Sequence, residues 1–456
     1  MPPALQTLGL AVSISLLLRI MLAGRYSVRT IPQQLWGEQM KPLSRRAALA
    51  SSAIAGASAA ASIARAASFG NPDLPPQGAV NVTNPNALSI PGPHDPALAN
   101  TMPSFLSPPP TDVGSMPEFW ASFNLAPRRI QDGGWGRQVT QSDFAISTEI
   151  AGVNMRLSAG GIRELHWHQQ AEWAIMTYGN CRITILDAQG RPYIQDVKEG
   201  DLWYFPAGLP HSLQGLAPDG AEFVLAFDNG SSSEFNTLPA TDWLAHTPPD
   251  ILAKNFGVPA DAFKNIPLQN RWIFQGKVPG PLAQVQAAAA GKAGAPEFPF
   301  TFSLYGAPRV DENASGYAQI ADSSNFKIST TIAAGLVTVK PGGLRTMHWH
   351  PNADEWQYYI KGSARMTVFN AGPAANTADF HPGDIGYVKK GLGHYVENTG
   401  TSDLVFLAVF RSPRYEEITL SDWLVHTPPE LVAANFNLDP AVIAQFPKGA
   451  PITMPE

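Results

Sequence analysis

The sequence predicts an all-β protein built from two tandem β-barrels, each followed by a short helical tail. One reason is an internal duplication: TDWLAHTPPDILAKNFGVP at 241–259 recurs as SDWLVHTPPELVAANFNLD at 421–439. A second reason is the many short segments rich in β-branched and aromatic residues and bounded by Gly, Pro or Asn, such as CRITILD and DLVFLAVF. The 456 residues include 42 Pro and 39 Gly, so we expect two domains with many turns rather than long helices.

The first 66 residues predict an export signal rather than part of a folded domain. A Ser-Arg-Arg start at 44–46 precedes a mildly apolar, alanine-rich run that ends in an Ala-x-Ala site at Ala66. This order is typical of a twin-arginine signal cleaved after Ala66, with Met40 as the initiator. An alanine-rich surface helix, or a membrane anchor in residues 1–39, is the alternative. We therefore expect a periplasmic or secreted mature protein with no stable membrane span.

The rest of the chain divides into a lead, two domains and a linker. We expect a Pro-rich lead at 67–115, an N-terminal barrel domain at 116–278, a linker at 279–299 and a C-terminal barrel domain at 300–456. The lead and the linker are rich in Pro, Ser, Asn or Ala, which favours extended or flexible connections. Each domain ends in a segment of the type PPDILAKNF, whose Pro-rich start is typical of a helix.

The charge of the mature chain argues against nucleic-acid binding, and the cysteine count excludes an internal disulfide. Of the 31 basic and 37 acidic residues, seven and one lie in residues 1–66, which leaves 24 basic and 36 acidic residues in the mature chain. That net charge of −12 argues against a nucleic-acid-binding protein, because phosphate contacts need basic patches. Cys181 is the only cysteine, so an internal disulfide is impossible, and its place in a predicted strand suggests a buried apolar role.

Two similar segments point to metal binding. They read GGIRELHWHQQAEW at 160–173 and GGLRTMHWHPNADEW at 342–356. Residues i and i+2 of a strand face the same side, so both histidines of each His-x-His pair can point into a barrel. A glutamate follows each pair, and a later histidine can complete each set. The predicted ligands are His166, His168, Glu172 and His211 in the first half and His348, His350, Glu355 and His394 in the second.

Each set offers three imidazoles and one carboxylate. With two further positions for water or substrate, such a set completes an octahedron, which favours Mn²⁺ or Fe²⁺ over a closed four-ligand zinc site. The ligand types do not choose between manganese and iron. Six of the ten histidines belong to the two sets, whereas His246 and His426 repeat in the helical tails, where we expect a structural role.

The ligands stand in a recognisable double motif. The pattern G(x5)HxH(x3–4)E(x6)G fits 160–179 and 342–362, and G(x5)PxG(x2)H(x3)N fits 200–215 and 383–398 with one departure each. Gly215 stands where Asn is usual, and Lys389 replaces the Pro. With GDLWYFPAGLPHS and TDWLAHTP, the region 120–445 resembles the bicupin oxalate decarboxylases of the cupin superfamily.

The resemblance implies a fold and an activity. The expected fold is a pair of jelly-roll-like cupin barrels, and the expected reaction converts oxalate to formate and CO2. The resemblance further implies two Mn²⁺ ions per chain, with Fe²⁺ as the second choice, dioxygen as a cofactor, and homo-oligomers that are trimers or stacked hexamers.

The resemblance also assigns residues that handle the substrate. It implies that Arg163 and Arg345 touch oxalate, with Arg163 taking part in catalysis. Each arginine lies three residues before a metal histidine, so on a regular strand it would face away from the ligands unless the strand bends. The Ser- and Gly-rich loop 227–238 suggests a mobile lid, and its Glu234 is the predicted proton donor.

The second half is less complete, and other activities stay open. Its loop 410–420 is shorter, so that either Glu417 or Arg414 corresponds to Glu234, and we expect the N-terminal site to do the chemistry. One alternative is an oxalate oxidase, which yields CO2 and hydrogen peroxide and needs no proton donor in the lid. Others are a non-catalytic metal-binding bicupin and a different metal-dependent cupin oxygenase.

Overall fold

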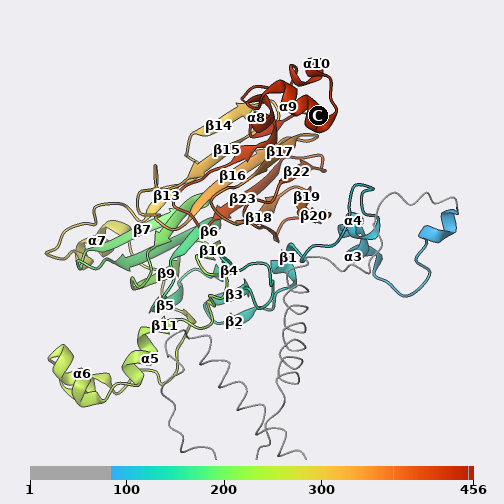
Figure 1. Ribbon diagram of the computed structural model, residues 1–456. Coiled ribbons are helices and arrows are strands. Elements are labelled where there is room, and N and C mark those ends of the chain that lie inside the picture. Colours follow the sequence, from blue (N-terminus) through green and yellow to red (C-terminus); the bar gives the residue numbers. More distant parts are fainter. Residues whose placement is uncertain (1–83, 373, 450, 456) are drawn as a thin grey trace, which may run out of the picture. The chain divides into compact units, whose positions relative to one another are not determined.

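The computed structural model describes residues 84–456 except 373, 450 and 456 (Figure 1). The predicted export signal and residues 67–83 of the predicted lead lie outside the described residues. In the part of the chain that is described, no helix is both long enough and apolar enough to cross a membrane. The prediction of an all-β protein with two barrels and helical tails is confirmed.

The N-terminal barrel is built around one long strand, β6 (Glu172–Leu186), which pairs with four others. The first part of β6 pairs with β8 and β10, and its second part pairs with β7 and β9. Because β6 pairs on both sides of the barrel, it joins the two sides into one sheet. The other strands are β2 (Arg129–Gln131), β3 (Gly134–Val139), β4 (Ala151–Leu157), β5 (Gly161–Trp167), β7 (Pro192–Lys198), β8 (Asp201–Phe205), β9 (His211–Gly215), β10 (Ala221–Phe227), β11 (Leu238–Pro239) and β12 (Ile273–Gln275).

The C-terminal barrel repeats this plan as two sheets. One sheet has the order β21, β18, β23, β16, β15, β14, and the other has the order β20, β19, β22, β17, β24 with β25 beside β17. The strands are β14 (Arg309–Asn313), β15 (Gly316–Ala321), β16 (Ala333–Val339), β17 (Leu344–Trp349), β18 (Glu355–Lys361), β19 (Ala364–Asn370), β20 (Ala374–Phe380), β21 (Asp384–Val388), β22 (His394–Asn398), β23 (Leu404–Phe410), β24 (Ile418–Thr419) and β25 (Thr453–Met454).

The two barrels exchange edge strands, which the sequence did not predict. Strand β1 (Trp120–Ser122) precedes the N-terminal barrel but pairs with β21 of the C-terminal one. Strand β13 (Thr301–Ser303) precedes the C-terminal barrel but pairs with β8 of the N-terminal one. Each exchange covers a sheet edge that would otherwise expose unpaired backbone groups.

Alternate residues of β6 face two different cores. Trp173 and Ile175 belong to a cluster that continues into the C-terminal barrel and includes Trp356, whereas Ala174 and Met176 face a second cluster inside the N-terminal barrel. Successive side chains of a strand point to opposite faces, so this part of β6 is buried on both. That burial explains why its sequence, WAIM, is apolar throughout rather than alternating.

Helices follow each barrel, as predicted. The first tail has α5 (Ala240–Ala245), α6 (Pro249–Phe256) and the 3-10 helix η4 (Ala260–Phe263), and the second has α8 (Leu420–Val425), α9 (Pro429–Phe436) and α10 (Pro440–Ile443) (Figure 1). The ring Nδ1 of His246 donates to Asp242 O, and that of His426 donates to Asp422 O. Both histidines close a helix and lie outside the two ligand sets, in agreement with a structural role.

The lead and the linker are more ordered than an extended arm. The described part of the lead contains η2 (Pro85–Leu88), α3 (Pro96–Thr101) and α4 (Pro103–Leu106), and η3 (Phe123–Leu125) follows β1. The backbone N and hydroxyl of Ser104 both donate to Asp379 Oδ2, at 2.8 and 2.6 Å, which fixes the lead to β20. The predicted linker contains α7 (Leu282–Ala289), which contacts β7.

Replacing Gly152 by alanine should destabilise the packing between the two barrels. An added Cβ would lie 2.5 Å from Trp356 and 3.2 Å from Phe123, both fully buried. We expect a loss of about 1–3 kcal/mol in the free energy of unfolding, measured by urea denaturation, because a packed core resists added atoms. Gly92→Ala is the control, since a Cβ there meets nothing within 4 Å. Equal unfolding midpoints for the two variants would contradict this packing.

Candidate metal centres

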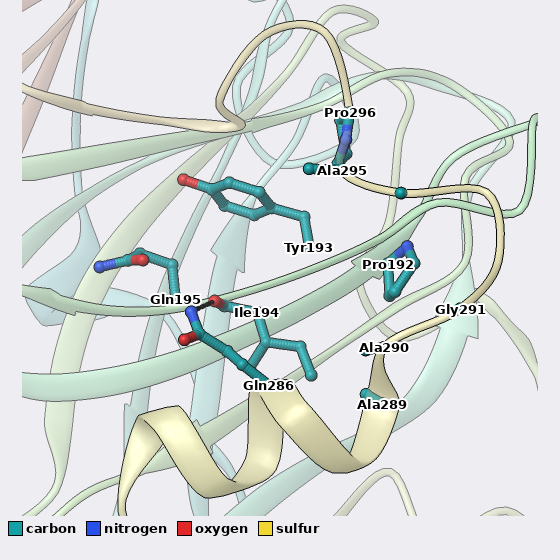
Figure 2. A pocket seen from close by; sticks show the side chains of 11 residues that line it. Pro192, Tyr193, Ile194, Gln195, Gln286, Ala289, Ala290, Gly291, Ala295 and Pro296 are labelled. Carbon is teal, nitrogen blue, oxygen red and sulfur yellow. Dashed lines mark hydrogen bonds between the residues drawn. The ribbon is translucent and has the colours of Figure 1, made fainter.

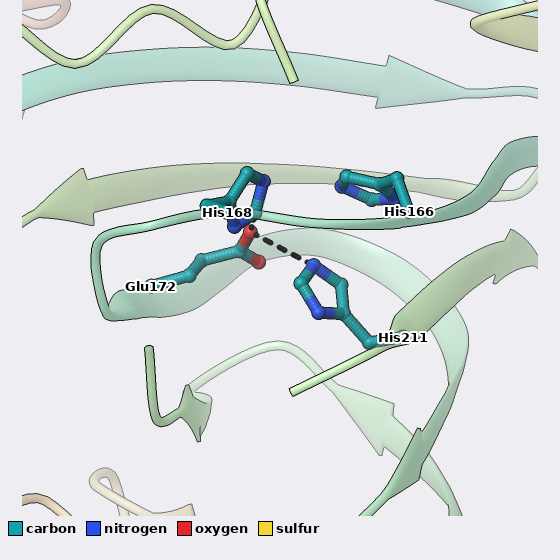
Figure 3. Close-up of side chains that lie close together, drawn as sticks. All are labelled: His166, His168, Glu172 and His211. Carbon is teal, nitrogen blue, oxygen red and sulfur yellow. Dashed lines mark ion pairs between the residues drawn. The ribbon is translucent and has the colours of Figure 1, made fainter. Parts of the chain in front are cut away.

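The structure brings together the four predicted ligands of the N-terminal half. His166 lies near the end of β5 and His168 just beyond it, Glu172 begins β6, and His211 begins β9. All four side chains are buried, and one ligand atom from each lies within 4.8 Å of the others (Figure 3). Strands that are distant in sequence thus meet at one point inside the barrel.

Backbone hydrogen bonds orient the imidazoles so that Nε2 faces the centre. The Nδ1 of His166 contacts Glu164 O at 2.6 Å, and the Nδ1 of His211 contacts Leu209 O at 2.8 Å. Since a carbonyl accepts, Nδ1 carries the proton and Nε2 keeps its lone pair. The Nε2 atoms of His166, His168 and His211 are buried and have no hydrogen-bond partner among the described residues.

Burial favours the neutral form of two of these rings. Burial, reinforced by the charge of Arg163, lowers the pKa of His166 well below its ordinary value, and burial also lowers the pKa of His211. A neutral imidazole is the form that binds a metal. Buried polar atoms normally find a partner, so three inward-facing lone pairs fit a cation.

The carboxylate of Glu172 completes the N-terminal set. Its Oε2 lies 3.5 Å from His211 Nε2 and 3.7 Å from His168 Nε2, while its Oε1 accepts a hydrogen bond of 2.8 Å from Trp203 Nε1. One oxygen is therefore held by the barrel wall and the other is free to face a metal. Such outer contacts fix the ligand's orientation and raise metal affinity.

In the C-terminal half, backbone carbonyls hold all three imidazoles. The Nδ1 atoms of His348, His350 and His394 donate to backbone carbonyls at 2.6, 2.7 and 3.1 Å. The carbonyl partner of His350 is Glu416, which belongs to the loop that corresponds to the N-terminal lid. The four buried ligand atoms of this half, Glu355 included, also lie within 4.8 Å of one another.

Glu355 has its own outer contact. Its Oε1 accepts from Gln357 Nε2 at 2.9 Å, and its Oε2 lies 2.7 Å from His394 Nε2 and 3.2 Å from His350 Nε2. Burial would raise the pKa of Glu355, but the two histidines hold that pKa well below its ordinary value. Both halves thus form a His3Glu metal site, and this mixed nitrogen and oxygen set suits Mn²⁺ or Fe²⁺.

A β-bulge turns Arg163 toward the ligands. In the pairing of β5 with β9, Arg163 lies opposite Leu213 and His166 lies opposite His211, so three steps on β5 match two steps on β9. The extra residue brings Arg163 to the same face as His166. The same register shift lies between Arg345 and His348 in the C-terminal half. This bulge is the bend that the sequence pattern required.

Arg163 holds Glu234 over the N-terminal centre. The guanidinium forms a short hydrogen bond through Nε to Glu234 Oε1, and its Nη2 donates to Thr237 Oγ1 at 2.9 Å. The other carboxylate oxygen, Oε2, lies 3.4 Å from His168 Nε2. Glu234 is only 1% exposed, so the lid loop is closed over the site.

The lid is anchored by its backbone as well as by its carboxylate. The Oε1 of Gln138, on β3, accepts from Glu234 N at 3.1 Å and from Ser233 Oγ at 3.1 Å. Trp272 Nε1 donates to Glu234 O at 3.2 Å. Burial alone would raise the pKa of Glu234, but Arg163 and His168 hold that pKa at about 2, so the side chain is a carboxylate here.

The structure places Glu417, not Arg414, at the position that corresponds to Glu234. Glu417 Oε2 forms a short ion pair with Arg345 Nη2 and accepts a 2.5 Å hydrogen bond from the hydroxyl of Tyr415. Arg414 is half exposed and lies 3.4 Å from Asp322. The C-terminal carboxylate therefore has a hydroxyl donor, whereas Glu234 Oε2 faces His168.

Several contacts around the centres were not predicted. They are made by Gln138, Trp203, Trp272, Gln357 and Tyr415. Trp203 carried a weak signal, since it belongs to the quoted segment GDLWYF, but its function depends on pairing with β6. Trp272 lies more than 100 residues from Arg163 in sequence, and no motif connects them.

The described residues of the N-terminal half line several cavities, including one beside the lid and one beside α7. One, of about 250 Å³, adjoins the closed lid and is lined by His168, Trp167, Phe227 and the polar residues of segment 231–237. The other, of about 360 Å³, lies between β7 and the segment that includes α7, and its lining residues include no predicted ligand (Figure 2).

Comparison with known proteins agrees with this geometry. A family model described as Cupin matches residues 123–262 and 302–444. The chain is 49% identical over 336 residues to the oxalate decarboxylase OxdC of Bacillus subtilis, covering 74% of this chain and 86% of that protein. It is 40% identical over 348 residues to a probable oxalate decarboxylase of Arthroderma benhamiae, covering 75% and 84% of the two chains.

The similarity extends to the three-dimensional structure. A structure of the Bacillus subtilis oxalate decarboxylase, from work on its Mn(II) centres, matches with a TM-score of 0.79 at 44% identity. The match covers 84% of this chain and 100% of that chain.

Replacing His166 by alanine should remove one metal ion per chain. The variant loses an inward Nε2 from the N-terminal set while the C-terminal set stays intact. We expect the metal content of the purified protein to fall from about two to about one per chain, since a lost ligand strongly weakens binding. His246→Ala is the matched control, because that ring only closes a helix. Unchanged metal content in the His166 variant would contradict the assignment.

Proposed function

The chain belongs to the bicupin oxalate decarboxylase family of the cupin superfamily, and we propose that it converts oxalate to formate and CO2, using Mn²⁺ and dioxygen. As a member of this family it is an enzyme, a carboxy-lyase. The observation that carries the proposed mechanism is the closed Arg163–Glu234 pair above three inward-facing imidazoles. Hydrogen oxalate yields CO2 and formate with atoms and charge in balance, so no net oxidation occurs and dioxygen is not consumed.

The metal ligands and Arg163 would act on different parts of the reaction. His166, His168, Glu172 and His211 would hold the metal, which supplies open coordination positions and, with dioxygen, the one-electron oxidation that loosens the carbon–carbon bond. Arg163 is the group that can bind a carboxylate of oxalate by paired hydrogen bonds, displacing the Glu234 oxygen that it holds in the closed site.

Glu234 moves the proton. Its pKa of about 2 makes it a carboxylate before substrate binds. When oxalate displaces Glu234 from Arg163, the main interaction that lowers this pKa is lost, so the freed carboxylate can accept the proton that hydrogen oxalate carries into the site. After CO2 has left, the same carboxyl group can return this proton to carbon and so complete formate. Burial of the lid excludes bulk water, which keeps the proton within the site.

We propose that the N-terminal centre alone performs this reaction. Glu417 occupies the corresponding position in the C-terminal half, but there Tyr415 donates a hydrogen bond to the carboxylate oxygen that pairs with Arg345. Glu417 would lose this hydrogen bond on turning toward a substrate, so the donor ties the side chain to its own loop. The C-terminal centre then serves structure or assembly, with its metal bound.

Two features lie beyond the active site. We propose that the mature chain is exported by the twin-arginine route, on the basis of the sequence signal alone. We also propose trimers or hexamers assembled through the helical tails, since Trp243 and Trp423 are 68% and 55% exposed there. Light scattering of the purified mature chain tests the assembly.

Replacing Glu234 by alanine should abolish most formate production without loss of metal. We expect formation of formate to slow about 100-fold or more, the usual contribution of a positioned acid–base group. The measurements are formate by enzymatic assay, hydrogen peroxide in the same samples, and bound manganese. Glu417→Ala is the matched control in the other half and should keep most of its activity. If peroxide dominates the products of the unmodified protein, the oxidase alternative holds instead.

Activity should be greatest in mild acid. Arg163 and His168 hold the pKa of Glu234 at about 2, so this group is already ionised throughout that range and does not limit activity there. The substrate must arrive as hydrogen oxalate, and its proton dissociates as the pH rises toward neutrality. We therefore expect kcat/KM for formate production to fall from mild acid to neutral pH. An optimum above neutrality would exclude proton delivery by the substrate.

A further inference from the structure

Lys389 stands where the cupin motif has proline, and its side chain connects the two halves of the protein. It directly follows β21, and its Nζ donates to Asp354 Oδ2 at 2.6 Å and to Thr148 Oγ1 at 2.7 Å. Asp354 belongs to the C-terminal half, whereas Thr148 lies in the loop before β4 of the N-terminal half. A proline at this position could make neither contact.

Asp354 connects this lysine to the C-terminal metal centre. It directly precedes the predicted ligand Glu355, and its side chain is only 5% exposed. Its Oδ1 accepts from Lys390 N at 2.8 Å, and its Oδ2 accepts from the Tyr387 hydroxyl at 2.8 Å as well as from Lys389. A buried carboxylate with three donors has a fixed position, and removing its one cationic partner is costly.

Thr148 holds Gly230, which lies near the start of the N-terminal lid loop 227–238. Gly230 N donates to Thr148 O at 3.1 Å, and Gly230 O accepts from Gln141 N at 2.7 Å. A Cβ on Gly230 would lie 1.9 Å from Ser147 O and 2.6 Å from Thr148 C, so the two segments touch through their backbones. Gly230 is four residues before Glu234. The position of Thr148 therefore fixes the start of the lid loop in space.

The lysine–aspartate link is present in the C-terminal half and has no counterpart in the N-terminal half. A tyrosine reaches across in both halves: the Tyr387 hydroxyl accepts from Glu149 N at 3.2 Å, and the Tyr204 hydroxyl lies 2.9 Å from Thr331 Oγ1. The N-terminal half, however, has Pro206 at the position of Lys389 and Ala171 at the position of Asp354. Its metal centre thus has no lysine–aspartate link to the C-terminal loop.

We propose that Lys389 is a positioning residue that ties the base of the N-terminal lid, through Thr148, to Asp354 beside the C-terminal metal centre. The proposal rests on the proposed function for what the lid does, but the link itself stands on these contacts. A metal held by Glu355 would fix the position of the neighbouring Asp354. Through its hydrogen bonds, Lys389 would then fix the position of Thr148, and Thr148 that of Gly230. The C-terminal centre then supports the N-terminal reaction without turning over substrate itself.

Hydrogen exchange of the lid tests the link without relying on activity. In the metal-loaded full chain, Lys389→Met should speed amide exchange in segment 229–238 about fivefold, because a link that is lost favours local opening. Lys390→Met removes the same charge from the next residue and should leave exchange unchanged, since Lys390 reaches Asp354 through its backbone N. Lys389→Arg should restore slow exchange. Equal exchange in Lys389→Met and Lys390→Met would overturn the proposal.

A double-variant experiment tests whether the C-terminal metal centre slows lid exchange through Lys389. Weakening that centre by Glu355→Gln or His394→Ala should speed lid exchange in the native background but add little once Lys389 is Met. Additive effects would show that the signal does not pass through Lys389 and would overturn the proposal. Formate assays on the same samples separate the two claims: altered lid exchange with unchanged formate production would leave the link intact but contradict the proposed role of the lid.

Discussion

The chemistry of this protein depends on a simple constraint, the fixed tautomer of buried histidines. A backbone carbonyl accepts the Nδ1 proton of His166, His211 and all three C-terminal ligand histidines, so each of these rings turns Nε2 toward the centre. Burial lowers the pKa of His166, His211 and His348, which favours the neutral ring. The Nε2 atoms of His166, His211, His350 and His394 have no hydrogen-bond partner among the described residues. The rigid barrel therefore maintains a costly arrangement of unpaired acceptors, which a divalent cation relieves.

The strand that carries the first ligand histidine of each half also brings an arginine to the metal site. A bulge of one residue in β5 brings Arg163 to the ligand face, and an equivalent bulge in β17 does so for Arg345. Each arginine meets a carboxylate from the loop after the last barrel strand. The duplicated domain thus repeats the whole arrangement of metal ligands, cation and acid, and not the metal ligands alone.

The two halves differ in how that acid is held. Glu234 is anchored through its backbone by Gln138 and Trp272, which leaves one carboxylate oxygen toward His168. Glu417 is instead bound at its carboxylate by the Tyr415 hydroxyl. Lys389 adds a second asymmetry, because it reaches Thr148, which holds the lid of the N-terminal half, whereas the corresponding residue of that half is Pro206. A duplicated fold can therefore keep two similar centres and assign them different tasks.

The sequence by itself determined the fold class, the duplication and the eight grouped ligand residues. Strand alternation makes a His-x-His pair face one side, and repetition makes coincidence implausible, so these conclusions need only local periodicity. Local pattern did not determine the exchange of β1 and β13, the orientation of Arg163, the choice of Glu417 over Arg414, or the partners of Lys389. Each of these depends on strand register or on contacts between residues far apart in the chain, and such contacts are decided by tertiary packing rather than by the order of neighbouring residues.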